Sequence, residues 1–291
     1  MVIEAKERND NHELLEELYD LTPEPNGNEL PPLNDDLTDE EIEEAGLYAQ
    51  LKCGVMLVTG EPGSGKDTFT HFLLWKLRVL FKDFKVMLDK KPRLLFGKYI
   101  PFNQHILMNE FKRLDENYKT GEISVGRDFA QWSKHKDRLN PLMERWLGDN
   151  DDLFYNTGIG LNEFWRYFYN RAPHNPMNKA ISPLFKRYRH HNMLVLGITP
   201  HKEELDVKSC LQYATHEVRC SQTASPGIHK ATIYQCRYFS GTSVLEIANT
   251  APITLWIDGL APQKRLGGKC VYDLFNSYER GESVPNVRLE E

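Results

Sequence analysis

Residues 55–68 read Val55-Met-Leu-Val-Thr-Gly60-Glu-Pro-Gly-Ser-Gly65-Lys66-Asp67-Thr68, an apolar run that passes into a glycine-rich turn and then into a helical pattern. The glycines permit backbone angles that other residues avoid, so successive N–H groups can converge on a phosphate at the N-terminus of the following helix. Lys66 is placed to reach the β- and γ-phosphate oxygens. The stretch therefore predicts a phosphate-binding loop, whose expected nucleotide-binding residues are Gly60, Glu61, Pro62, Gly63, Ser64, Gly65, Lys66, Asp67 and Thr68.

This loop departs from the usual pattern G-x-x-x-x-G-K-[ST] at one position. Asp67 stands where a Ser or Thr hydroxyl normally ligates Mg²⁺, and Thr68 follows it. We expect ATP and Mg²⁺ as cofactors, with metal ligands that differ from the usual set.

Charge divides the chain into two parts. Residues 1–46 hold 16 Asp or Glu and only two basic residues, which leaves 34 basic and 26 acidic residues in 47–291. The first part is too charged and proline-broken to bury a core, although Thr38 and Glu41 predict a capped short helix at its end. We expect an acidic, flexible tail over 1–46 and one domain over 47–291. The basic excess of that domain suits a polyanionic partner, and an ordinary solvated surface is the alternative.

Cysteine use and hydropathy indicate the compartment. The five cysteines include no C-x-x-C pair, and no window approaches eighteen uncharged apolar residues. We expect free thiols, no membrane contact and a cytoplasmic location, which is the host cytoplasm if the protein is viral.

The remaining pattern alternates between strands and helices. An apolar helix is expected over 69–81, and strands are expected at 84–88, at 153–161 with interruptions at Gly158 and Gly160, and at the apolar run 193–198. Later stretches at 217–221, 228–239 and 243–257 alternate like antiparallel strands around a turn at Gly241. The fold class predicted is α/β, with a mainly parallel sheet flanked by helices and a C-terminal β-hairpin.

Two polar residues end predicted strands. Glu163 follows the strand at 153–161 and Thr199 follows the strand at 193–198, where ligands bind in open α/β sheets. Glu163 is the candidate to orient or deprotonate the attacking water, and Thr199 to hydrogen-bond the γ-phosphate or that water. The alternatives are a solvated glutamate at a helix start and an ordinary threonine at a strand end.

Several segments in series resemble those of FtsK/HerA-type P-loop ATPases, including viral genome-packaging ATPases and zonular occludens toxin-like proteins. The likeness spans roughly residues 52–280. Gly158 to Arg171 is similar to the Walker B strand and the helix after it, and Phe185 to His191 is similar to the basic helix. Leu194 to Pro200 is similar to the sensor strand, and Glu204 to Leu211 to the segment after it. Tyr272 to Glu279 is similar to a closing box of the viral members.

This resemblance implies a RecA/ASCE-like P-loop NTPase that translocates double-stranded DNA, most directly a viral genome-packaging motor. It implies a homo-oligomeric ring, a pentamer or hexamer, working with a portal or capsid protein. In such rings a basic residue completes the neighbouring subunit's site, and the candidates are Arg187, Arg189 and Arg171, with contact to solvent or DNA phosphate as the alternative.

Departures from the family leave other functions open. Asn162 replaces the Walker B Asp and Pro200 replaces the sensor Gln, so slow hydrolysis or a non-hydrolysing nucleotide-binding scaffold is one alternative. Another is a small-molecule kinase, because residues 63–68 also resemble the loop of phage-type deoxynucleoside monophosphate kinases. Asp67 and Asn162 carry the usual carboxylate and neutral group in exchanged positions. We hypothesise that they compensate for each other near the metal, whereas unrelated substitutions with Thr68 as the hydroxyl are the alternative.

Overall fold

The computed structural model describes residues 32–89, 99–101, 154–164, 185, 187–200, 202, 205, 210–239 and 244–275. Its elements, with η marking a 3₁₀ turn, are α2 (Asp39–Ala49), β1 (Gly54–Thr59), α3 (Lys66–Leu80), β2 (Lys85–Leu88), β3 (Tyr99–Pro101), β4 (Thr157–Leu161), β5 (Leu194–Ile198), η3 (Leu211–Tyr213), β6 (His216–Gln222), β7 (Ile228–Phe239), β8 (Val244–Ile247), β9 (Ile253–Asp258), η4 (Lys264–Leu266) and η5 (Val271–Leu274).

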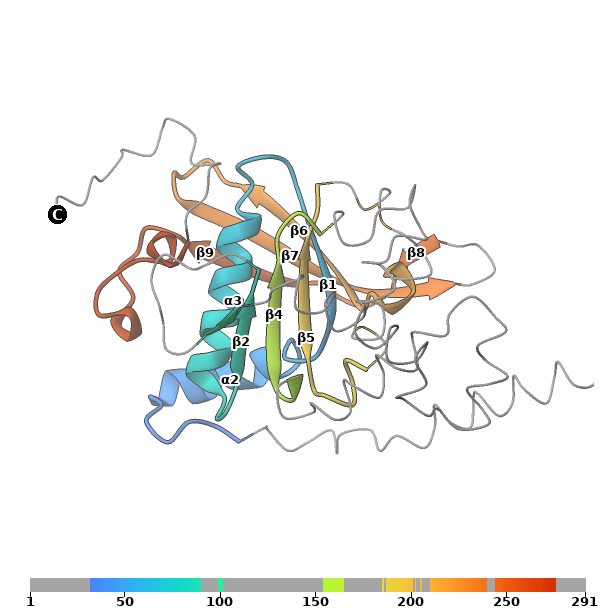
Figure 1. Ribbon diagram of the computed structural model, residues 1–291. Helices are drawn as coiled ribbons and strands as arrows, with labels where there is room; N and C mark the ends of the chain where they lie inside the picture. Colours follow the sequence, from blue (N-terminus) through green and yellow to red (C-terminus); the bar gives the residue numbers. More distant parts are fainter. Residues whose placement is uncertain are drawn as a thin grey trace, which may run out of the picture. The chain divides into compact units, whose positions relative to one another are not determined.

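The described strands form one mixed sheet of nine strands (Figure 1). Their order is β3-β2-β4-β5-β1-β6-β7-β8, and β9 pairs with β7 over part of its length. Every pairing from β3 to β6 in this order is parallel, whereas β7 is antiparallel to β6, β8 and β9. Because β5 lies between β1 and β4 and all three are parallel, their carboxyl ends meet at one edge of the sheet.

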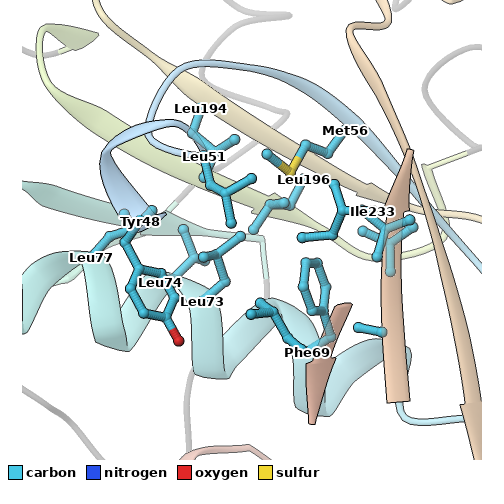
Figure 2. Packing of buried hydrophobic residues seen from close by; sticks show 14 of the residues in the cluster. Tyr48, Leu51, Met56, Phe69, Leu73, Leu74, Leu77, Leu194, Leu196 and Ile233 are labelled. Carbon is cyan, nitrogen blue, oxygen red and sulfur yellow. The ribbon is translucent and has the colours of Figure 1, made fainter. Parts of the chain in front are cut away.

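Helix α3 packs its apolar side chains against the sheet, as the sequence predicts (Figure 2). Ten of its 15 residues are buried. Gly158 and Gly160 do not interrupt β4 but let α3 approach it, because a Cβ on Gly158 would lie 2.4 Å from Leu74. The cluster drawn in Figure 2 joins α2, α3 and the sheet through Tyr48, Leu51, Met56, Phe69, Leu73, Leu74, Leu77, Leu194, Leu196 and Ile233.

The segment before β1 belongs to the same packing. Thr38 caps α2 in the predicted capping box with Glu41, and the buried residues Ala45 and Tyr48 join the core cluster that includes α3. Upstream, the Asn34 side chain donates to two carbonyls in the last turn of α3, groups that a helix end otherwise leaves unpaired. The compact unit starts at Leu33, so the domain boundary expected at residue 46 falls inside α2.

The late strands are more divided than the sequence predicts. The expected hairpin is present as β7 and β8, but the stretch expected as one strand over 243–257 forms β8 and then β9. Asn249 and Thr250 form a bend and Pro252 stands just before β9, where it has no N–H for a sheet hydrogen bond. Strand β9 returns along β7 instead of extending β8.

Two further expectations concern the whole chain. All five cysteines have free thiols. No helix in the described ranges has both the length and the apolar character that a bilayer crossing requires.

Candidate active site

The predicted phosphate loop lies between the end of β1 and the start of α3. Gly60 has φ 143°, and a Cβ there would lie 2.5 Å from both the Cys220 carbonyl oxygen and Ser64 Oγ, so no larger residue fits. Gly65, with φ 91°, is the N-cap of α3, which starts at Lys66. The N-terminus of a buried helix thus opens directly onto the loop, which is the arrangement that favours a bound phosphate.

Lys66 folds back across this loop. Its side-chain Nζ donates to the carbonyl oxygens of Gly60 and Glu61, both at 2.9 Å, and the residue is only 4% exposed. Ser64 Oγ is buried and has no hydrogen-bond partner among the described residues. A buried ammonium and an unpartnered hydroxyl in a glycine-lined cradle fit the charge and acceptor oxygens of a polyphosphate.

The two residues after the lysine differ in exposure. Thr68 is buried at 3% exposure, whereas Asp67 is half-buried and its carbonyl oxygen contacts His71 Nδ1 at 2.9 Å. Within the described residues, no group of three or more His, Cys, Asp or Glu side chains is arranged to hold a metal ion. A Mg²⁺ ion here would thus take ligands from phosphate and water as well, as Mg²⁺ does in nucleotide sites.

The predicted polar residues follow strands whose carboxyl ends lie at the same edge of the sheet as the start of the loop. Ile198 of β5 pairs with Val58 of β1, and Thr199 then donates its backbone N–H to Val58 O at 3.0 Å. Gly197 pairs with Leu161, the last residue of β4, so Asn162 and Glu163 emerge beside Thr199. Thr199 is fully buried there.

Glu163 is presented by a constrained turn. Its φ is 48°, a left-handed conformation that costs a residue other than glycine about 1 kcal/mol. The next residue, Phe164, is fully buried with its ring where a Cβ on Gly197 would lie, and it packs edge-on against Phe185. Backbone strain held in place by packing is a feature of functional sites.

A second carboxylate, Asp89, lies at this edge and was not among the predicted site residues. Asp89 follows β2, and its Oδ2 accepts the Asn162 backbone N–H at 2.7 Å. An acidic residue directly after the predicted strand at 84–88 was the available signal. Asp89 reaches Asn162 only because β2 lies next to β4, and the sequence does not reveal that pairing.

A cationic group was also missed. Glu217 of β6 is buried and binds Lys202 Nζ at 2.8 Å and Arg219 Nε at 2.9 Å, and Arg219 also stacks over Tyr234. Burial acts to raise the pKa of Glu217, but the two cations hold it below its usual value, so the carboxylate is charged. Arg219 pairs with Thr59, the last residue of β1, so this arginine lies near the start of the loop.

The predicted arginines lie elsewhere. Arg187 and Arg189 precede β5, and Arg189 contributes a positive charge near Cys53, just before β1. They are thus at the amino edge of the sheet, away from the loop of the same chain. A role in a neighbouring subunit's site stays a prediction, and Arg171 lies outside the described residues.

A phosphate loop between β1 and α3, with β5 inserted between β1 and β4, defines the RecA/ASCE-like P-loop NTPase fold. The fold class predicted from the sequence is therefore confirmed.

Comparison with known proteins gives similarity at the level of structure. No protein-family model matches the sequence, and no curated protein matches it significantly. The N-terminal domain of zonular occludens toxin from Neisseria meningitidis is 14% identical, covering 77% of this chain and 100% of that one at a TM-score of 0.37. The genome packaging NTPase B204 from Sulfolobus turreted icosahedral virus 2, in complex with ATP-gammaS, is 11% identical, covering 68% of this chain and 98% of that one at a TM-score of 0.35. A third solved structure, an ATPase domain, is 11% identical, covering 89% of this chain and 97% of that one at a TM-score of 0.41.

The first two of these proteins represent the groups that the sequence resembles. At such identities a likeness concerns the fold alone, and the fold assignment rests on the strand order and the loop.

Proposed function

We propose that this chain binds ATP with Mg²⁺ at the phosphate loop, hydrolyses it, and uses the energy to move double-stranded DNA, most directly as a viral genome-packaging motor. The observation that carries the proposal is Glu163, which a strained and packed turn presents at the sheet edge that the loop shares. Three other described residues, Asp83, Asn156 and Asn192, share this left-handed backbone but lie at the amino ends of strands, so among them Glu163 is the one at the carboxyl edge.

The proposed division of labour follows from position. The loop N–H groups and Lys66 bind the phosphates, Glu163 accepts the proton of the attacking water, and Thr199 hydrogen-bonds the γ-phosphate or that water. Asp67, Thr68 and Asn162 would hold Mg²⁺ with the phosphates, and the ion would neutralise the charge that develops there.

DNA and a ring of subunits complete the proposal. The excess of 34 basic over 26 acidic residues in 47–291 supports binding to a polyanion. In a ring, Arg187, Arg189 or Arg171 would act on the neighbour's nucleotide, while Arg219 already stands at the carboxyl edge of its own chain. A portal or capsid protein would be the partner that receives the DNA.

One observation favours a second candidate, a nucleotide-binding scaffold that does not hydrolyse ATP. Asn162 follows β4 where the resembled family has an aspartate, so the site lacks one carboxylate beside the metal. Asp89 and Asp67 are the groups that could make up the missing charge.

Phosphate release from ATP separates the functions when it is measured on one preparation in three conditions: ATP alone, ATP with duplex DNA, and ATP with a deoxynucleoside monophosphate. The motor predicts Mg-dependent release from ATP that duplex DNA stimulates and Lys66→Ala abolishes. Formation of ADP and a deoxynucleoside diphosphate from an added deoxynucleoside monophosphate, without free phosphate, would instead establish a kinase. ATP binding with neither phosphate release nor phosphoryl transfer in any condition would establish the scaffold.

A further inference from the structure

The segment 271–275 begins the closing box found in the sequence, and the function proposed above gives it no role. It forms η5 and the residue after it, and its buried residues pack on α3 through Trp75 and against Leu266. Tyr272 is held at its backbone, where its N–H donates to Gly259 O at 3.1 Å. Its ring fills the place where a Cβ on Gly259 would lie, 2.5 Å from the ring atoms. The segment is therefore fixed to the end of β9.

From this position Tyr272 reaches the phosphate loop through one intermediate residue. Its hydroxyl hydrogen-bonds His229 Nε2, and the two rings meet edge to face with centroids 5.8 Å apart. The His229 residue is 6% exposed and its ring lies directly against Gly65, since a Cβ there would be 2.4 Å from His229 Cγ and Nδ1. Gly65 is the N-cap of α3, so Tyr272 supports the loop at the residue that turns it into the helix.

A second contact reaches the other side of the same junction. Phe275 stacks on His71 of α3, with centroids 4.7 Å apart and an interplanar angle of 20°. His71 Nδ1 in turn contacts the carbonyl oxygen of Asp67 at 2.9 Å, in the first turn of the helix. The rings of Tyr272 and Phe275 also contact each other, with centroids 6.2 Å apart. The two contacts therefore bracket Lys66, one at the residue before it and one at the residue after it.

We propose that residues 271–275, with His229 and His71, position the phosphate loop, so that nucleotide affinity depends on a segment that does not touch the nucleotide. The proposal rests on nucleotide binding at the loop, as proposed above. Coupling of this kind is reciprocal, so a bound nucleotide also stabilises the segment. These are positioning residues, and their loss affects binding more than the chemical step.

The test compares Tyr272→Phe with Tyr48→Phe. Both variants remove one hydroxyl from a buried tyrosine that packs near α3, but Tyr48 contacts Phe72, away from the loop. Amide hydrogen exchange of residues 60–67 is measured in the nucleotide-free proteins, and the dissociation constant for ATPγS is measured in parallel. We expect faster loop exchange and about fivefold weaker ATPγS binding in Tyr272→Phe, since a buried hydrogen bond contributes about that factor. Tyr48→Phe keeps the parent values in both.

The outcomes separate this proposal from the proposed function. Loop exchange in Tyr272→Phe equal to the parent's would overturn the positioning role, whatever the affinity. Loss of ATPγS binding from the parent protein itself would remove the nucleotide function, while the exchange result would still decide whether the segment supports the loop. A fall in turnover at unchanged ATPγS affinity would contradict a positioning role, because it would place Tyr272 in the chemical step.

Discussion

Lys66 is the residue on which the proposed phosphate binding most depends. Its ammonium is buried and donates to two loop carbonyls, so the free protein already holds it inside the loop. We expect Lys66→Ala to weaken ATP binding by at least about a hundredfold, because a charge-assisted hydrogen bond contributes about 1.5–3 kcal/mol and this ammonium makes several. Calorimetric titration with ATPγS measures this, and Lys76→Ala on the far part of α3 is the matched control. Equal affinity in Lys66→Ala and the parent protein would place the nucleotide elsewhere.

Glu163 is the candidate general base, and Asp89 is the neighbour against which it is tested. Glu163→Gln keeps the side-chain shape but cannot accept a proton, so ATPγS should still bind while turnover falls by at least about a hundredfold. Asp89→Asn retains an oxygen that can accept the Asn162 N–H and should lose far less. Single-turnover hydrolysis of ATP measures the loss of turnover in both variants. The reverse order of the two losses would make Asp89 the base and Glu163 a structural residue.

The exchanged pair Asp67 and Asn162 gives a prediction that no single variant can test. If they compensate, Asn162→Asp alone is harmful, since it adds a carboxylate to an edge that already holds Asp89 and Glu163. Asp67→Ser alone is harmful because it removes the carboxylate nearest the loop lysine in sequence. The ATPase rate of the double variant should be at least about tenfold higher than that of either single variant. A double-mutant cycle measures this coupling from ATPase rates across Mg²⁺ concentrations. If the losses of ATPase rate in the two single variants add in the double variant, Asp67 and Asn162 are unrelated substitutions and do not compensate for each other.

At the scale of elements, the sequence predicts what local patterns determine. The strands β1 and β5 are buried on both faces and read as nearly continuous apolar runs, β4 is buried but carries Thr157 and two glycines, and Thr38 with Glu41 marks the start of α2. Pairing is set by contacts between distant residues, so the order of the strands does not follow from any local run. Glu163 and Thr199 were singled out because each follows a predicted strand, and their roles stay predictions. Asp89 follows a predicted strand too, but its place beside Asn162 depends on β2 pairing with β4, as the place of Arg219 depends on β6 pairing with β1. Arg187 and Arg189 precede β5, in the basic segment where the resemblance put them, and their role in a neighbouring subunit's site stays a prediction.

Arg265 joins the C-terminal η4 to the start of α2, and this link is testable by pH. It binds both side-chain oxygens of Glu41 and also reaches Asp36. Hydrogen bonds from Arg265, with smaller contributions from Thr38, lower the pKa of Glu41 from 4.5 to about 2, so the stabilisation is full above pH 4.5 and is lost as the pH falls toward 2. Arg265→Ala should lower the free energy of unfolding by about 1 kcal/mol at neutral pH, a modest value because the groups are partly solvated.

The same variant should flatten the acid end of the stability curve. Urea unfolding at several pH values measures both effects, and Lys264→Ala, at the exposed neighbouring position, is the control. A difference between Arg265→Ala and the parent that stays constant from neutral pH to the most acid value would show that Arg265 acts through packing and not through Glu41.

At the scale of the whole molecule, the prediction concerns DNA. Residues 47–291 carry 34 basic and 26 acidic residues, and a protein that binds duplex through lysines and arginines releases the counterions condensed on the phosphates. Affinity should therefore fall at least about tenfold between about 50 and 200 mM salt, with log K linear in log salt. Fluorescence anisotropy of a labelled duplex measures this. Because Lys66 is 4% exposed, its ammonium is not available to DNA, and Lys66→Ala should keep the parent's salt slope while losing ATP binding. A flat salt response would remove duplex DNA from the proposed function, and a slope that changes with Lys66→Ala would show that DNA and nucleotide compete for the loop.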